Sequence, residues 1–392
     1  MQKFLSGLTG LALVMLGTGA AGAQDTVKIG LIISYSGQFA DTAAQMDNAV
    51  KLYVKQHGDT VAGKKLEFIR KDTGGIAPDL AKRLAQEVIV RDGADILAGF
   101  ALTPNALAAA DVSAEAKKFM VIMNAATSII TTKSPYIART SVTTPMLNGT
   151  LGAWAVKHGV KTAYTMVSDY GPGIDAEGAF QLAFKEAGGE IVGSARFPVA
   201  NADFSAFVQR AKDLNPDAIF IWIPGGTQPA AVGKALAERG IDMAKTKIMG
   251  QDVLTDESAL KSMGDVGIGI ITASNYDYNH KSALNEAFVK AYNDEYHRNP
   301  DIFSAGGYDG MHLIYETLKK TGGKTDGDSL IAAAKGMAWE SPRGPMSIDP
   351  ETRDVVETVY IRRVEKVGNG LRNVEFDSVP NVKDPVKARM KN

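Results

Sequence analysis

Small and polar residues follow several apolar runs of the sequence, at points where strands of a sheet are expected to end. After the apolar run that begins at Phe119, the chain continues as Asn124-Ala125-Ala126-Thr127-Ser128. Hydroxyls and free backbone N–H groups at a helix start are hydrogen-bond donors that a bound molecule can use. On its own, this stretch is interpreted either as an ordinary turn or as half of a ligand site.

Five other segments repeat this pattern along the chain. They are Ser34–Gly37, Gly99–Asn105, Ser168–Gly173, Pro224–Pro229 and Gly250–Val253. In doubly wound sheets, ligands bind outside the carboxyl ends of the strands, where helix N-termini supply N–H groups. Each segment alone is typical of a turn before a helix, but six of them in two halves predict a binding cleft.

Residue patterns of catalysis are scarce. The first expected strand is followed by Gly37 alone rather than G-x-G-x-x-G, and Lys234 in "GGTQPAAVGKA" lacks the flanking residues of a P-loop. The five histidines are scattered, and no G-x-S-x-G is present. The S-x-x-K match at Ser258–Lys261 is common in helices. We therefore expect no catalytic residues, no metal and no cofactor.

Composition narrows the possible partners. The 392 residues include 43 basic and 44 acidic side chains, for a formal net charge of -1. This balance predicts neither a nucleic-acid-binding surface nor a polybasic lipid-binding surface. The absence of cysteine excludes disulfides and thiolate chemistry. The basic C-terminal "KDPVKARMKN" is interpreted as a solvated tail.

The N-terminus predicts export. Lys3 precedes a short apolar region, and Ala21-Gly22-Ala23 fits the small-residue pattern of a cleavage site before Gln24. Residues 1–23 are therefore interpreted as a secretory signal peptide. The apolar region is shorter than the roughly 20 residues that a membrane-spanning helix needs. We expect a mature protein that works as a monomer in a bacterial periplasm.

Alternating apolar runs and amphipathic stretches predict βαβ units with mainly parallel sheets. Strands are expected at 27–34, 65–71, 94–100, 119–125 and 136–141, and again at 161–170, 190–198, 217–225, 245–251 and 266–276. Residues 344–365 alternate like an antiparallel hairpin. The two halves have no flexible linker between them. This predicts that the chain crosses between them several times in ordered segments and that they form a cleft, rather than two independent domains.

These motifs, in this order, resemble the periplasmic solute-binding proteins of ABC importers, in the branch that binds leucine, isoleucine and valine. The resemblance rests on "GLIISYSGQFA", the "AAT" at Ala125–Thr127, "DYGPG", "DFSAFVQRAKDLNPDAIFI", "NPDIFSAGGYDGMHLI" and "GPMSIDPETRD". It implies an α/β fold of two Rossmann-like lobes of mainly parallel sheet flanked by helices. Three hinge crossings would join the lobes, with the ligand cleft between them. The N-terminal lobe would comprise 24–142 and 276–346, and the C-terminal lobe 143–275 and 347–392.

The resemblance also implies a binding site. A carboxylate would be held in the first lobe at Leu102, Thr103, Ala125, Ala126 and Thr127. Phe303 would form an apolar wall, and Tyr170 would close over the ligand from the second lobe. The family's ammonium-binding tyrosine and glutamate map to Thr227 and to Asp252, or to Gln251 if the register slips by one.

The expected function is therefore capture of a small carboxylate by lobe closure and its delivery to an ABC permease, with no covalent chemistry. The first expectation for the ligand is an aliphatic, branched-chain amino acid. Loss of the tyrosine at Thr227 leaves an aromatic carboxylate of the benzoate or cinnamate type as the alternative. A ligand-sensing module for a signalling receptor and an exported enzyme on the same fold are two further alternatives.

Overall fold

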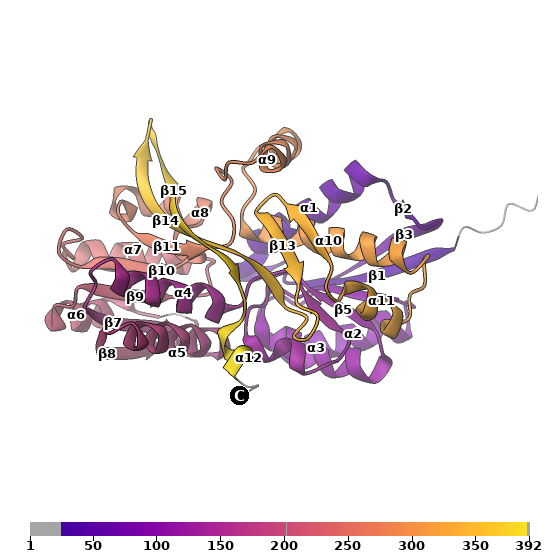
Figure 1. Ribbon diagram of the computed structural model, residues 1–392, viewed down its shortest axis with the longest axis horizontal. Coiled ribbons are helices and arrows are strands. Elements are labelled where there is room, and N and C mark those ends of the chain that lie inside the picture. Colours follow the sequence, from indigo (N-terminus) through magenta and orange to yellow (C-terminus); the bar gives the residue numbers. More distant parts are fainter. Residues whose placement is uncertain (1–24, 201, 390–392) are drawn as a thin grey trace, which may run out of the picture.

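The computed structural model describes residues 25–200 and 202–389. Within them the chain forms two α/β lobes that lie side by side along the long axis of the molecule (Figure 1). Each lobe has its own mostly parallel sheet with helices on both faces, so the predicted fold class is confirmed. The predicted signal peptide, residues 1–23, lies outside the described residues and stays a prediction.

The first lobe is built on a six-stranded sheet of order β2-β3-β1-β4-β5-β6. Its elements are β1 (Thr26–Ile33), η1 (Gly37–Phe39), α1 (Ala40–His57), β2 (Thr60–Val61), β3 (Lys64–Asp72), α2 (Pro78–Val90), β4 (Ile96–Gly99), α3 (Thr103–Ala116), β5 (Phe119–Ile122), η2 (Ser128–Thr132) and β6 (Ile137–Arg139). Strands β4 and β5 are buried at every residue, as expected of central parallel strands covered on both faces. Successive residues of β1 alternate between two cores: Leu31 packs on the side of α1, and Ile32 on the side of α2 and α3.

The second lobe is built on the sheet β12-β13-β14-β11-β10-β9-β7-β8, with β15 paired to β14. Its elements up to β11 are α4 (Thr144–Lys157), β7 (Thr162–Ser168), α5 (Gly171–Glu186), β8 (Glu190–Phe197), α6 (Phe204–Leu214), β9 (Ala218–Trp222), α7 (Gln228–Glu238), β10 (Lys247–Gln251), η3 (Asp252–Thr255), α8 (Glu257–Met263), η4 (Gly264–Gly267) and β11 (Ile271–Ser274). A proline occupies the first turn of α2, α3, α4, α5 and α7. Its fixed φ and missing N–H suit the start of a helix, which is why these starts could be predicted.

The chain passes between the lobes three times. It leaves the first sheet after β6, returns to the first lobe after β11, and enters the second sheet again through β12, β13 and β14. The elements after β11 are α9 (Ala283–Tyr296), α10 (Ile302–Lys320), α11 (Gly327–Ala334), β12 (Ala338–Ser341), β13 (Gly344–Ile348), β14 (Val355–Val367), β15 (Gly370–Val382) and α12 (Pro385–Arg389). Strands β13 and β14 pair antiparallel, which confirms the predicted hairpin.

Helix α10 packs closely against the end of β5 and against α1, because a glycine faces each of them. A Cβ on Gly306 would lie 2.1 Å from the carbonyl oxygen of Met123, and one on Gly307 would lie 2.5 Å from that of Met46. Any side chain at either position would therefore push the helix away. The Ala-Gly-Gly sequence thus fixes the start of α10, and with it Phe303, against the end of β5.

One sequence interpretation is wrong. The basic C-terminal segment is not only a solvated tail, because α12 packs against the protein and the side chain of Lys387 is 5% exposed. Its amino group pairs with the buried carboxylate of Asp354.

Among residues 25–200 and 202–389, no helix is long and apolar enough to cross a membrane.

Candidate functional site: a cavity between the lobes

A small cavity lies between the two lobes at the carboxyl ends of the parallel strands. Its volume is ≈ 60 Å³, room for a few water molecules on a scale where one water needs roughly 10–15 Å³. The lining residues are Phe39, Thr42, Ala101, Leu102, Thr103, Asn124, Ala126, Ser141, Val142, Tyr170, Pro172, Trp222, Ile223, Pro224, Gln251, Val253, Asn275, Ile302, Phe303 and Arg343. A cavity of this size takes only a small ligand.

The first-lobe wall combines a hydroxyl pair with a helix start. The side-chain oxygens of Thr103 and Thr127 lie 3.1 Å apart and are buried, with Thr103 lining the cavity. Thr103 is the first residue of α3, and the N-cap residue Leu102 offers no side-chain hydrogen bond to the helix. The first N–H groups of α3 therefore depend on other acceptors, which favours an anion at this point.

The loop after β5 is held in place by its own backbone. Ala126 lines the cavity, whereas Ala125 lies behind it. The N–H of Ala125 donates to the carbonyl of Phe100 at 3.0 Å, and its carbonyl accepts from Nη1 of Arg139 at 3.1 Å. Nδ2 of Asn124 donates to the carbonyl of Ala101 at 2.8 Å. The small residues after β5 thus form a rigid turn that leaves space for a ligand.

The second-lobe wall is aromatic and amide-bearing. The rings of Tyr170 and Trp222 are 5.6 Å apart at an angle of 52°. The Trp222 indole N–H donates to Oε1 of Gln251 at 2.8 Å, and Nδ2 of Asn148 donates to the same oxygen at 2.9 Å. The orientation of the indole ring is therefore fixed by a buried hydrogen bond. From the first lobe, Phe39 and Phe303 complete the apolar surface at 2% and 5% exposure.

The floor of the cavity is formed by the three segments that pass between the lobes. Ser141 follows β6, Asn275 follows β11, and Arg343 lies between β12 and β13. The hydroxyl of Ser141 is buried and has no hydrogen-bond partner among the described residues. A buried polar group without a partner is rare in folded proteins, so this hydroxyl is available to a ligand.

Arg343 is held by two carboxylates from distant parts of the chain. Its Nη2 lies 2.7 Å from Oδ2 of Asp309, and its Nη1 lies 3.4 Å from Oε2 of Glu357. Nη2 also donates to the carbonyl of Thr140 at 2.6 Å. Oε1 of Glu357 accepts from Nδ2 of Asn275 at 3.0 Å. Burial raises the pKa of Glu357 to about 7, with Arg343 opposing the shift.

Two residues that the resemblance placed in the site lie elsewhere. Thr227 is exposed at the N-cap of α7 and does not line the cavity. Asp252 is buried and does not line the cavity. Its carboxylate accepts from the N–H of Val253 at 2.8 Å and from Oγ of Ser274 at 3.4 Å. Burial raises the pKa of Asp252 to about 6, although Arg362 opposes the shift. The alternative residue, Gln251, lines the cavity instead.

The other predicted residues are brought together. Leu102, Thr103, Ala126, Tyr170 and Phe303 line the cavity. Ala125 and Thr127 support it from behind, as described above. Their roles toward a ligand stay a prediction. Sequence reasoning missed five lining residues: Phe39, Ser141, Trp222, Asn275 and Arg343. Ser141, Trp222 and Asn275 lie at or near the ends of predicted strands and Phe39 follows one, whereas nothing in the sequence sets Arg343 apart.

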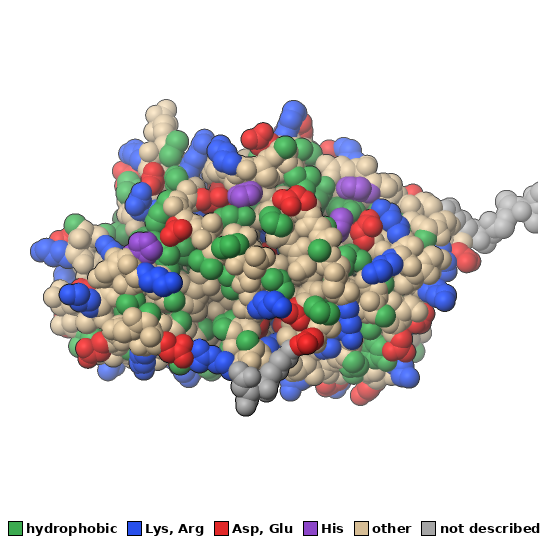
Figure 2. Space-filling view, viewed as in Figure 1, with side chains coloured by type: hydrophobic (Ala, Val, Ile, Leu, Met, Phe, Trp, Pro, Cys, Tyr) green, Lys and Arg blue, Asp and Glu red, His purple; other side chains and the backbone are tan. Residues whose placement is uncertain are grey.

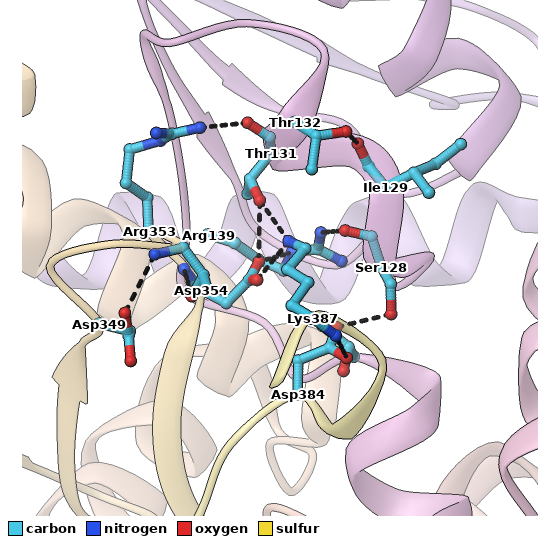
Figure 3. A network of polar contacts seen from close by, with 12 residues as sticks. Ser128, Ile129, Thr131, Thr132, Arg139, Asp349, Arg353, Asp354, Asp384 and Lys387 are labelled. Atoms are coloured by element: carbon cyan, nitrogen blue, oxygen red, sulfur yellow. Dashed lines mark hydrogen bonds and ion pairs between the residues drawn. The ribbon is translucent and has the colours of Figure 1, made fainter. Parts of the chain in front are cut away.

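A buried polar network ties the crossing segments together (Figure 3). Nε of Arg139, at the end of β6, lies 3.1 Å from Oδ1 of Asp354, which precedes β14. Lys387 of α12 pairs with the other oxygen of Asp354. Oγ of Ser128 donates to Oδ2 of Asp384 at 2.6 Å, and its N–H donates to Oδ2 of Asp175 in α5 at 3.0 Å. These contacts join both lobes beside the cavity.

Comparison with known proteins decides the family. A family model described as periplasmic binding protein matches residues 26–369. The chain belongs to this family. A curated relative of this periplasmic binding protein, the Leu/Ile/Val-binding protein homolog 6 of Brucella melitensis, is 39% identical over 381 residues, 96% of this chain and 97% of the relative. The predicted family membership is thereby confirmed.

Solved structures agree with the fold of this periplasmic binding protein. A solute-binding protein of an ABC transporter from Rhodopseudomonas palustris BisB5, solved with 3,4-dihydroxybenzoic acid, is 52% identical with a TM-score of 0.89. Another from R. palustris HaA2, solved with p-hydroxybenzoic acid, is 40% identical with a TM-score of 0.90. Each comparison covers 93% of this chain and 100% of the other. These relatives are binding proteins and not enzymes, as predicted for this chain.

Proposed function

We propose that this chain is the extracytoplasmic binding component of an ABC importer and that it captures a small aromatic carboxylate, such as a hydroxybenzoate. One observation carries the choice of ligand. Arg343 is the only charged side chain that lines the cavity among the described residues, and no aspartate or glutamate lines it. An α-amino acid brings an ammonium group, which would be buried there without a carboxylate partner at a cost of several kcal/mol.

The residues that line the cavity suit an aromatic acid. Phe39 and Phe303 from one lobe and Tyr170 and Trp222 from the other supply the aromatic surface. Offset and edge contacts between aromatic rings add about 0.5–1.5 kcal/mol each to the burial of apolar area. The carboxylate would accept hydrogen bonds from the Thr103 hydroxyl and from the free N–H groups at the start of α3. These donors can hold it without a positively charged side chain.

The polar floor suits a second substituent. Ser141 and Asn275 belong to the floor, and the buried hydroxyl of Ser141, which has no partner among the described residues, would stay unpaired beside an aliphatic side chain. A hydroxyl group on the ring would pair with it. This fits the relatives that were solved with hydroxylated benzoic acids at 52% and 40% identity.

A branched-chain amino acid is the second candidate. Its support is the name of the curated relative, Leu/Ile/Val-binding protein homolog 6, at 39% identity. The site provides fewer partners for an amino acid, because the expected ammonium ligands, Asp252 and Thr227, do not line the cavity.

The transport role follows from closure. Binding to residues of both lobes favours the closed form by its differential affinity for that form, and a membrane permease would recognise the closed protein. The predicted signal peptide would place the mature protein in the periplasm, and a monomer suits a diffusing carrier. The lobe boundaries at residues 142, 275 and 346 belong to the same proposal.

A thermal-shift panel tests the ligand. A ligand at 100 times its Kd stabilises the folded protein by about 2.7 kcal/mol. We expect hydroxybenzoates to raise Tm and leucine, isoleucine and valine to leave it unchanged. If only the amino acids raise Tm, the second candidate is correct. If no compound of the panel raises Tm and a purified receptor kinase responds to the protein instead, the transport role is wrong.

A further inference from the structure

A second cavity lies in the second lobe, away from the interlobe site. Its volume is ≈ 340 Å³. It is lined by Pro145, Met146, Gly149, Thr150, Ala153, Trp154, Lys157, Ala179, Leu182, Ala183, Val379, Val382, Lys383, Pro385, Val386 and Arg389. These residues come from α4, α5, β15 and α12, and we call the feature the α4–α12 groove. None of them belongs to the interlobe site.

The groove combines an apolar floor with basic residues. Twelve of its sixteen lining residues are apolar or glycine, three are basic, and none is acidic. Figure 2 shows hydrophobic and basic side chains interleaved over the area where Figure 1 places α4 and α12. Concave apolar surfaces with a few polar groups are typical of binding grooves, and soluble proteins seldom leave them uncovered.

The basic residues differ in how they are paired. Lys383 pairs with Asp349 at 2.9 Å, and Arg389 pairs with Glu186 at 2.8 Å. Lys157, in the last turn of α4, makes no ion pair with any residue that the structure describes. Its ammonium group is therefore free to meet an anion at the edge of the groove.

The walls of the groove are fixed from behind. Asp384 and Lys387, which flank Pro385 and Val386, are buried and bonded to Ser128 and Asp354. The indole N–H of Trp154 donates to Asp377 at 2.8 Å, and its ring stacks on His158. A Cβ on Gly149 would meet Ala179 and Pro385 at 3.8 Å, so α4 lies at van der Waals distance from α5 and α12 at this point. The walls of the groove are therefore part of the packed fold.

We propose that the α4–α12 groove is a second binding site, for an anionic amphiphile with one apolar chain and a carboxylate head, of the medium-chain fatty acid type. The apolar floor would take the chain, and Lys157 would pair with the head. A second copy of the chain fits less well, because a two-fold interface would bring the three basic residues of one groove close to those of the other. A concave site also fits a free amphiphile better than the surface of a membrane.

Decanoate is the probe, and titration calorimetry on the full mature protein is the measurement. We expect one decanoate to bind, and to bind at least about tenfold more tightly than decyltrimethylammonium, since the lining is cationic. Leu182→Glu changes a side chain that is 41% exposed, and it should weaken decanoate binding by about tenfold or more because it places a carboxylate in the apolar floor. Lys157→Glu should also weaken decanoate binding, whereas Lys157→Arg should leave it unchanged. The matched control Leu214→Glu, at 44% exposure outside the groove, should change nothing.

Four results would overturn the proposal. Decanoate binding that 4-hydroxybenzoate displaces would place the probe in the interlobe cavity. Equal binding of the cationic amphiphile would remove the role of charge. Binding to phosphatidylglycerol vesicles, without binding of free decanoate, would make the groove a membrane contact. A dimer in sedimentation that Leu182→Glu dissociates would make it a contact between copies of the chain.

Discussion

Arg343 and Asp309 form a fully buried ion pair, with Nη2 of the guanidinium 2.7 Å from Oδ2 of the carboxylate, directly under the interlobe cavity. Glu357 lies on the other side of the guanidinium at 3.4 Å. The three residues come from α10, the β12–β13 turn and β14, so the charge at the floor of the cavity depends on both lobes being correctly placed.

Arg343→Gln should lower the free energy of unfolding by about 3–5 kcal/mol, because it leaves buried carboxylates without their cation. The matched control is Arg363→Gln. Arg363 pairs with Glu365 at the surface, and such exposed pairs contribute about 0–1 kcal/mol. Urea denaturation of both variants is the measurement. Equal, small losses would mean that the buried pair does not hold the floor together.

Glu357 should make the protein less stable as the pH rises toward neutrality. Its pKa is about 7 in the folded protein against 4.5 in an unfolded chain, so the folded state holds more protons between these values. The free energy of unfolding from this group therefore falls as pH increases from about 4.5 to 7, by up to about 1.4 kcal/mol per pH unit. Glu357→Gln removes the titrating group.

Chemical denaturation at pH 5 and at pH 7.5 checks this sign. The unmodified protein should lose more stability between the two pH values than Glu357→Gln does. Asp301, whose pKa burial raises to about 7, contributes in the same direction and remains in both proteins. A larger loss in the variant than in the unmodified protein would contradict the assignment.

Thr103→Val should weaken binding of 4-hydroxybenzoate by about tenfold or more, since a hydrogen bond to a charged group contributes about 1.5–3 kcal/mol. Valine keeps the shape of threonine and removes only the hydroxyl that lines the cavity. Thr227→Val is the control at an exposed position outside the cavity, and its Kd should be unchanged. Titration calorimetry gives both values. If Thr227→Val is the weaker binder, the carboxylate is held at the second lobe instead.

Asp252→Asn separates the two ligand classes. The carboxylate faces Ser274 and not the cavity, so an acid without an ammonium group should bind almost as well to the variant. An amino acid held by Asp252 would instead lose about 2–5 kcal/mol of binding free energy. The Kd for 4-hydroxybenzoate and for leucine, each measured with both proteins, decides between them.

Lys387→Met should destabilise the fold by about 3–5 kcal/mol, because Lys387 is buried against Asp354 in the network of Figure 3. Lys383→Met is the matched control. Lys383 is 63% exposed in its pair with Asp349, so its loss should cost about 1 kcal/mol or less. Thermal denaturation followed by circular dichroism measures both. A Tm for Lys387→Met equal to that of the control would show that α12 does not fasten the crossing segments.

Most of the fold could be predicted because its signals are local. Buried parallel strands such as β4 and β5 appear as short apolar runs, and helices such as α3 begin with a proline. Strand β15 was not predicted, because it pairs only with β14 and buries few of its side chains. Without a buried face it shows no clear apolar alternation.

The site was less predictable because its floor is made by pairing across long distances. Arg343 stands in a short turn, and its partners Asp309 and Glu357 come from other elements, so no sequence pattern connects them. The choice between Gln251 and Asp252 also depended on where strand β10 ends. Gln251 is the last residue of β10 and lines the cavity, whereas Asp252 begins η3 and does not line it.

The interlobe cavity should accept a carboxylate, and its lining offers no partner for an ammonium group. Titration calorimetry with 4-hydroxybenzoate, leucine and 4-methylpentanoate tests it most directly, because the last two differ only in the ammonium group. We predict that 4-hydroxybenzoate binds most tightly and that 4-methylpentanoate binds more tightly than leucine. Tight binding of leucine, with weak or no binding of both plain acids, would contradict it.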